Sequence, residues 1–172
     1  MSELPDRIVG NKKEGKKTIT LCMIVKDEKT PHLIECFESM KDKIDYWVIC
    51  DNGSTDGTQE YIREYWAEQG IPGELIEVPW EGFGKTRTRA LKECEGKADY
   101  AWVIDADDYL VGDFDFPHDL PMDAYALRIK RGNFEWWRNQ IFRLEILLVQ
   151  QIRHISMQRP NTFVMRILSL MH

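Results

Sequence analysis

Short apolar segments alternate with helix-like segments along the first hundred residues, and this alternation constrains the fold more than any other feature. Four apolar runs have the length of buried strands, at residues 18–25, 45–50, 74–78 and 100–104. One predicted helix falls in each gap between these runs, and the connections to it are short. Strands and helices that alternate in this way predict an α/β fold with a single, mostly parallel sheet flanked by helices.

Local signals indicate where the helices begin and end. Thr30 and Pro31 can cap and start the first helix. Asp56, with Gln59 three residues later, predicts a capped start for the second helix. Gly70 is typical of the residue that ends a helix. A third helix is expected around residues 88–94.

Composition narrows the class of protein. A chain of 172 residues suits one domain with a single sizeable core, and the net charge of −6 gives no basic footprint for nucleic acid. The polar N-terminus has no apolar stretch typical of a signal peptide, and no apolar run is long enough to cross a bilayer. Four cysteines lie in apolar stretches without a CxxC pair, which favours buried thiols in a reducing compartment. We therefore expect a cytoplasmic protein.

Polar clusters follow three of the predicted strands. They are Lys26-Asp27-Glu28, Asp51-Asn52-Gly53 and the acidic run from Asp105 to Asp108. In open α/β sheets, ligands bind at the carboxyl ends of the strands. The fold would therefore bring these distant clusters to one edge of the sheet.

The acidic run in WVIDADDYL requires a compensating positive charge. Asp105, Asp107 and Asp108 directly follow a buried strand, although closely spaced carboxylates repel one another and resist dehydration. One interpretation is a set of exposed loop acids or a helix cap. The other is a site for magnesium or manganese, which bind through one or two carboxylates together with substrate phosphates.

Two glycine-containing segments partly resemble a calcium-binding loop and a phosphate-binding loop, but neither matches the full motif. DNGSTDGT, residues 51–58, is a strand-to-helix turn rather than a calcium loop, because Ile62 occupies the position that needs glutamate. GFGKT, residues 82–86, is a weak phosphate loop, because Pro79 stands where glycine is required. The following helix carries Lys85, Arg87 and Arg89, and basic residues near a helix start suit an anionic ligand. For Lys85 and Arg89 a solvated basic face is an equally good interpretation.

Four segments together resemble a known family. TLCMIVKDE, WVICDNGSTDGT, GFGKTRTRAL and WVIDADDYL, in this order, resemble the nucleotide-binding half of family 2 glycosyltransferases, which have the type A fold. The resemblance covers residues 18–145. It implies a nucleotide-sugar donor, with UDP- or GDP-sugars first, a divalent cation (manganese or magnesium), and inversion at the sugar carbon.

The resemblance also implies roles for individual residues. Glu28 and Asp51 match residues that hold the base and ribose, with Lys26 in the same nucleotide-sugar site. Arg87 matches a basic residue near the base and phosphates. The DxD pair corresponds to Asp105 and Asp107, of which Asp107 is the better candidate for direct metal contact. RNQIFRLE, residues 138–145, resembles the strand after the acceptor-side loop, but no residue is selected as the catalytic base.

The composition changes abruptly after Glu145. Residues 146–172 contain no Asp, Glu, Lys or Gly, whereas all 29 acidic residues precede them. This predicts three parts: a polar arm at 1–17, the nucleotide-sugar-binding domain at 18–145, and an atypical tail at 146–172 that is not the family's acceptor segment. A basic amphipathic helix in the tail, in weak contact with a membrane surface, is the alternative.

Three functions stay open at this point. The first is an active glycosyltransferase whose acceptor is unknown. The second is a nucleotide-sugar-binding module with little transfer, because the acceptor half is missing. The third, weakened by Pro79, is a phosphotransferase with a phosphate loop.

Overall fold

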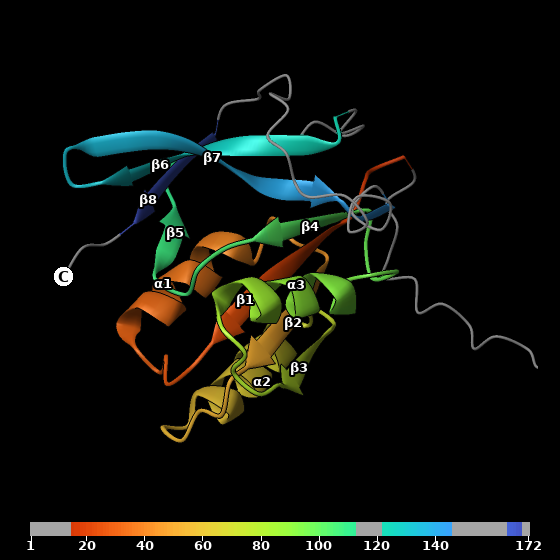
Figure 1. Cartoon of the computed structure of the whole chain (residues 1–172), viewed down its shortest axis with the longest axis vertical. Coiled ribbons are helices and arrows are strands. Elements are labelled where there is room, and N and C mark those ends of the chain that lie inside the picture. The colour runs from red at the N-terminus through yellow and green to blue at the C-terminus, as the bar shows by residue number, and fades with distance from the viewer. Residues whose placement is uncertain (1–14, 113–121, 146–164, 170–172) are drawn as a thin grey trace, which may run out of the picture.

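The computed structural model describes residues 15–112, 122–145 and 165–169 (Figure 1). Three helices and eight strands occupy these ranges. In chain order they are β1 (Ile19–Val25), α1 (Pro31–Met40), β2 (Tyr46–Asp51), α2 (Thr58–Gln69), β3 (Gly73–Glu77), α3 (Phe83–Glu93), β4 (Tyr100–Val103), β5 (Asp108–Leu110), β6 (Ala124–Arg131), β7 (Phe134–Arg143) and β8 (Met165–Ser169).

The eight strands form one sheet in the order β3-β2-β1-β4-β7-β6-β8-β5. The four strands predicted from the alternation lie together, and β1 pairs in parallel with both β2 and β4, while β2 pairs in parallel with β3. The second half begins where β7 pairs antiparallel to β4. The predicted α/β sheet with flanking helices is confirmed, and its second half is mixed rather than parallel.

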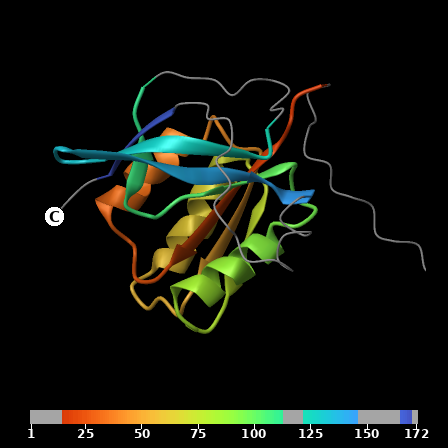
Figure 2. The same cartoon turned by 45° about the horizontal axis from the view of Figure 1, so that its top comes forward.

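Helices cover both faces of the parallel half, as Figure 2 shows. Alternate residues of each strand point to opposite faces, so β1 directs Leu21 and Met23 towards α1 and α2, and Cys22 towards α3. Leu33, Phe37 and Met40 of α1 are buried on the first face, as the helical spacing predicts. The second face is smaller and packs against Ala90 and Cys94.

The helix ends follow the predicted signals with three differences. Pro31 begins α1 as predicted, but the side chain of Thr30 makes no capping hydrogen bond. Gly70 ends α2 in the left-handed conformation, at φ 68°. Asp56 accepts the N–H of Thr58 at 3.0 Å, but Gly57 is the residue that precedes the helix, and Gln59 does not complete a capping box. The third helix begins at Phe83, earlier than expected.

The predicted tail contributes one strand within the described residues. β8 pairs in parallel with β6 and antiparallel with β5. The amphipathic helix that is the alternative for the tail, and most of the N-terminal arm, lie outside the described residues. All four cysteines, Cys22, Cys36, Cys50 and Cys94, are buried and free, as the sequence predicts. None of the described helices combines the length and apolar character needed to span a membrane.

Candidate functional site

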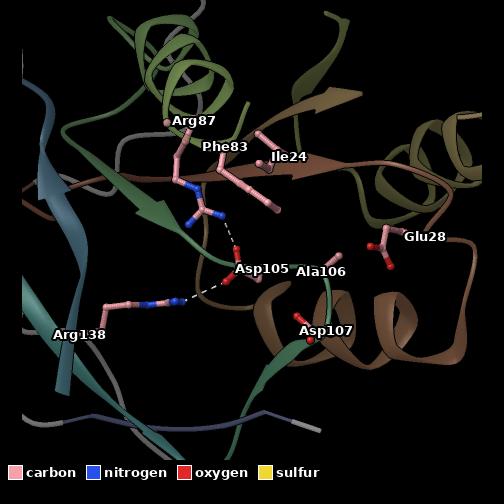
Figure 3. A pocket seen from close by; sticks show the side chains of 9 residues that line it. Ile24, Glu28, Phe83, Arg87, Asp105, Ala106, Asp107 and Arg138 are labelled. Atoms are coloured by element: carbon pink, nitrogen blue, oxygen red, sulfur yellow. Dashed lines mark hydrogen bonds and ion pairs between the residues drawn. The ribbon is translucent and has the colours of Figure 1, made fainter. Parts of the chain in front are cut away.

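A cleft of about 710 Å³ opens at the carboxyl ends of β1 and β4, beside the start of α3 (Figure 3). Four of the residues predicted for the site line it: Glu28, Arg87, Asp105 and Asp107. Phe83 and Arg138 are among the other lining residues. The fold therefore brings these four predicted residues together, although Glu28 and Asp107 are 79 positions apart in the sequence.

Asp105 lies between two guanidinium groups. Arg87 donates a short hydrogen bond from Nη2 to Oδ1, and Arg138 donates one of 3.3 Å from Nη2 to Oδ2. Burial alone would raise the pKa of Asp105, but the charges and hydrogen bonds of Arg87 and Arg138 hold the pKa below its ordinary value. Asp105 is therefore ionised at neutral pH and fixed on both oxygens.

Arginine also neutralises the other two carboxylates of the acidic run. Arg131 lies 3.3 Å from Asp107 and 3.8 Å from Asp108, and Arg138 lies 3.4 Å from Asp108. The side chain of Asp108 is 1% exposed, whereas that of Asp107 is 46% exposed. Three guanidinium groups thus supply the positive charge that the sequence of this run requires.

The carboxylates differ in how well they suit a divalent cation. Among the described residues, no group of three or more His, Cys, Asp or Glu side chains could hold a metal by itself. Magnesium and manganese sites often use only one or two carboxylates plus substrate phosphates. Exposed Asp107, which forms one ion pair, fits that role, whereas both oxygens of Asp105 are occupied by Arg87 and Arg138.

Glu28 lines the opposite side of the cleft from Arg138 (Figure 3). Its backbone N–H donates to Oγ1 of Thr58 at 2.8 Å, which fixes the loop after β1 against α2. Burial raises the pKa of Glu28, and the negative charges of Asp107 and Asp56 raise it further. The carboxyl group of Glu28 is therefore easier to protonate than an ordinary glutamate.

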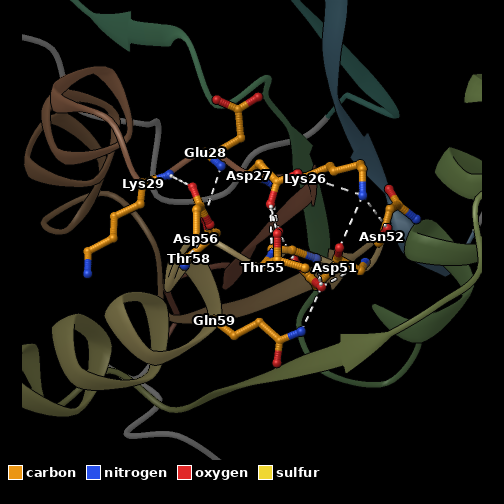
Figure 4. Close-up of polar contacts among 12 residues, drawn as sticks. Lys26, Asp27, Glu28, Lys29, Asp51, Asn52, Thr55, Asp56, Thr58 and Gln59 are labelled. Carbon is orange, nitrogen blue, oxygen red and sulfur yellow. Dashed lines mark hydrogen bonds and ion pairs between the residues drawn. The ribbon is translucent and has the colours of Figure 1, made fainter.

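Asp51 and Lys26 are not among the residues that line the cleft. Figure 4 shows the polar contacts that they make instead. Asp51 is fully buried, and its carboxylate accepts the N–H groups of Gly53 and Ser54, both at 2.9 Å. It also accepts a bond of 2.7 Å from Gln59 and a short one from the Ser54 hydroxyl. Lys26 donates to the carbonyl oxygen of Gly53 at 3.1 Å. Both residues stabilise the DNGSTDGT turn.

The chain matches the family model described as "Glycosyl transferase family 2" over residues 20–164. The chain belongs to glycosyl transferase family 2. The resemblance found in the sequence is confirmed, and the match continues past Glu145 into the segment with the altered composition.

A curated relative and two solved structures illustrate the extent of the likeness. The lipopolysaccharide core biosynthesis glycosyltransferase LpsC of Rhizobium meliloti is 34% identical over 79 residues, which are 46% of this chain and 28% of LpsC. S. aureus TarS 1–349 in complex with UDP-GlcNAc superposes with a TM-score of 0.62 at 15% identity, covering 90% of this chain and 59% of TarS 1–349. GalNAc-T7 with UDP, GalNAc and Mn²⁺ gives a TM-score of 0.67 at 9% identity, covering 93% and 45% of the two chains.

These comparisons support the fold of the family 2 domain. Identities of 15% and 9% carry no residue roles across by themselves. The chain spans between 21% and 28% of the length of the curated relatives it matches.

Sequence reasoning missed two arginines that pair with the acidic run. Arg131 and Arg138 come from the β6–β7 hairpin, beyond the four quoted motifs. The acidic run from Asp105 to Asp108 could have indicated them, because three adjacent carboxylates require several positively charged side chains in addition to a metal ion. By contrast, Lys85 and Arg89 are exposed and lie outside the cleft lining, and Arg89 pairs with Glu93 at 3.9 Å. For these two residues the structure favours the solvated-face interpretation.

Proposed function

We propose that this family 2 domain binds a nucleotide-diphosphate sugar in the cleft and transfers the sugar to an acceptor hydroxyl with inversion. The observation that carries the proposal is the convergence of Glu28, Arg87, Asp105 and Asp107 on one cleft at the carboxyl edge of the parallel strands. Ligands bind at this edge in open α/β sheets.

Each residue has a role that follows from its surroundings. Glu28, together with the turn held by Asp51 and Lys26, offers hydrogen-bond acceptors to the nucleoside. Arg87 extends from the first turns of α3, where the helix terminus and the guanidinium both favour phosphate. Asp107 and the donor phosphates would hold manganese or magnesium. That cation would stabilise the charge of the departing diphosphate.

The ligands bound in the neighbouring structures suggest which nucleotide to test first. The TarS structure contains UDP-GlcNAc, and the GalNAc-T7 structure contains UDP and Mn²⁺. We infer that UDP-sugars are the first donors to test for this chain, with GDP-sugars next and manganese as the first cation. The acceptor and the catalytic base stay unassigned.

A binding module with little transfer activity is the second candidate. It is favoured by one observation: the cleft residues that have a proposed role, Glu28, Arg87 and Asp107, all serve the donor and none serves an acceptor. The phosphotransferase alternative loses its support, because the chain belongs to a glycosyltransferase family and the segment after Pro79 leads into α3 of that fold.

A thermal-shift panel with UDP-GlcNAc, GDP-mannose and dTDP-glucose, each with and without manganese, tests the proposal. A ligand that binds only the folded state raises the melting temperature. We expect a rise with one nucleotide class, larger with manganese. No rise with any donor would contradict donor binding. Release of free nucleotide diphosphate in the presence of candidate acceptors then separates the transferase from the binding module.

A further inference from the structure

The two guanidinium groups that contact Asp105 come from opposite halves of the sheet. Arg87 belongs to α3, which packs on the parallel half, and Arg138 belongs to β7, the first antiparallel strand. In Figure 3 both side chains extend into the cleft and converge on the same carboxylate. Asp105 thereby holds the two positive groups at a fixed separation inside the cleft.

Arg138 is also fixed by a second carboxylate. Its Nη2 lies 3.4 Å from Oδ2 of Asp108, a side chain that is 1% exposed. A buried carboxylate is costly unless it is paired, so Asp108 anchors the guanidinium strongly. The side chain of Arg138 itself remains 38% exposed. It is therefore held in place by Asp105 and Asp108 and yet accessible from the cleft.

The anchoring contacts leave donors for a ligand. Both hydrogen bonds of Arg138 use Nη2, and a guanidinium carries five N–H donors. Among the described residues, Nη1 and Nε of Arg138 have no hydrogen-bond acceptor. A guanidinium positioned in this way suits a doubly contacted phosphate, since its planar fork matches the spacing of two phosphate oxygens.

We infer that Arg138 is a second diphosphate-binding residue of the donor site, and that Asp105 and Asp108 are the residues that position it. Asp105 thus acts mainly by holding the guanidinium groups of Arg87 and Arg138, while Asp107 is the carboxylate that would bind the divalent cation. This inference rests on the proposed function, because it names how the same cleft holds the phosphates of the donor.

Calorimetric titration of UDP, UMP and uridine, in manganese and in EDTA, tests the role of Arg138. We expect Arg138→Ala to weaken UDP binding about 10- to 100-fold, as for loss of a charged hydrogen bond. Uridine binding should stay within about twofold, because the nucleoside lies away from the phosphates. The loss should appear in EDTA as well as in manganese, since the guanidinium contacts phosphate directly.

Arg128→Ala is the matched control. Arg128 lies on the adjacent strand β6 with a similar side-chain exposure of 35%, pairs with Glu135 at 3.4 Å, and does not line the cleft. Its UDP affinity should equal that of the wild type. Arg138→Lys, which keeps the charge and loses the planar fork, should bind UDP with an affinity between those of the wild type and Arg138→Ala.

Asp105→Asn tests the positioning role. It should weaken UDP binding and leave uridine binding unchanged, with manganese still strengthening whatever UDP binding remains. If Arg138→Ala and Arg138→Lys both bind UDP like the wild type, or lose uridine and UDP affinity by the same factor, the inference is wrong. If the wild-type domain binds neither UDP nor GDP under any condition, the proposed function fails instead. Should Arg138→Ala not fold, Arg138→Lys decides by the same comparison.

Discussion

Gln59 donates a hydrogen bond of 2.7 Å from Nε2 to Oδ2 of Asp51, and this contact ties the first turn of α2 to the end of β2. The same carboxylate receives the backbone N–H groups of Gly53 and Ser54. Asp51, which the sequence suggests as a ligand contact at a strand end, thus also accepts the hydrogen bonds that hold the following loop. The loop in turn fixes Glu28 through Thr58.

We expect Asp51→Asn to lower the free energy of unfolding by about 1–3 kcal/mol at pH 7, because an amide cannot accept all the hydrogen bonds that the carboxylate accepts. Urea unfolding measures this difference. Burial acts to raise the pKa of Asp51, but the hydrogen bonds from Ser54, Gln59 and Gly53 lower it overall.

The lowered pKa sets the pH dependence of the Asp51→Asn effect. A depressed folded-state pKa gives stability that is present above the unfolded pKa of about 3.9 and is lost as pH falls through the folded value. The difference between wild type and Asp51→Asn should therefore be constant from about pH 8 to 5 and shrink below about pH 4. Exposed Asp42, changed to Asn, is the control and should have little effect at pH 7. A difference that grows on acidification would contradict this account.

Asp107→Asn should remove the strengthening of UDP binding by manganese while leaving manganese-free binding within about threefold. The fold should be nearly unaffected, because the exposed ion pair with Arg131 contributes about 0–1 kcal/mol. Calorimetry with and without manganese measures both quantities. Asp123→Asn, at an exposed carboxylate paired with Arg143 at 3.5 Å, is the control. Equal manganese dependence in Asp107→Asn and wild type would exclude Asp107 as a metal ligand.

Gly73→Ala should destabilise the domain by about 1–3 kcal/mol, the usual cost of overpacking. A Cβ at this position would lie 2.2 Å from Cδ2 of the Trp47 ring, so the indole must move. Trp47 is held there by its own hydrogen bond of 2.9 Å from Nε1 to the carbonyl oxygen of Ile71. Chemical denaturation followed by the intrinsic tryptophan fluorescence, to which Trp47 contributes, measures the change.

Gly84→Ala is the counterpart of Gly73→Ala inside α3. A Cβ there would meet nothing within 4 Å, so alanine should stabilise the helix by up to about 1 kcal/mol. Because Gly84 lines the cleft, the added methyl group also tests how closely a ligand approaches the helix. A stability gain with weaker UDP binding would indicate close approach at this residue. A loss of stability would show that the helix start tolerates no side chain.

Deletion of residues 146–172 should leave a folded domain that still binds UDP. Two hydrophobic clusters, built from residues between Ile19 and Leu144, cover the two faces of the parallel half. The deletion removes β8, but β5 keeps its contact with α1 through the bond of 3.0 Å from Leu110 N–H to Ser39 Oγ. Circular dichroism and UDP titration test this. Unfolding of the shortened chain would show that the tail is integral to the domain, and loss of liposome binding alone would favour the membrane-surface alternative.

The sequence predicts the parallel half well, because apolar runs and helix-ending residues such as Gly70 act locally. It also identifies Glu28, Arg87, Asp105 and Asp107, since strand ends of a parallel sheet meet at one edge. The role of Arg138 depends on which strand pairs with β4, and no local pattern specifies that pairing. Gln59 illustrates the same limit, because its spacing fits a capping box while a carboxylate eight residues earlier offers a better partner.

The junction between β4 and β7 has a consequence for how the domain matures. If Arg87 and Arg138 both contact the diphosphate, as proposed, neither half of the sheet carries both groups, because α3 supplies Arg87 and β7 supplies Arg138. Affinity for the diphosphate would then arise only after the hairpin has docked beside β4. The nucleotide would therefore bind to and stabilise only those chains in which the two halves of the sheet have assembled.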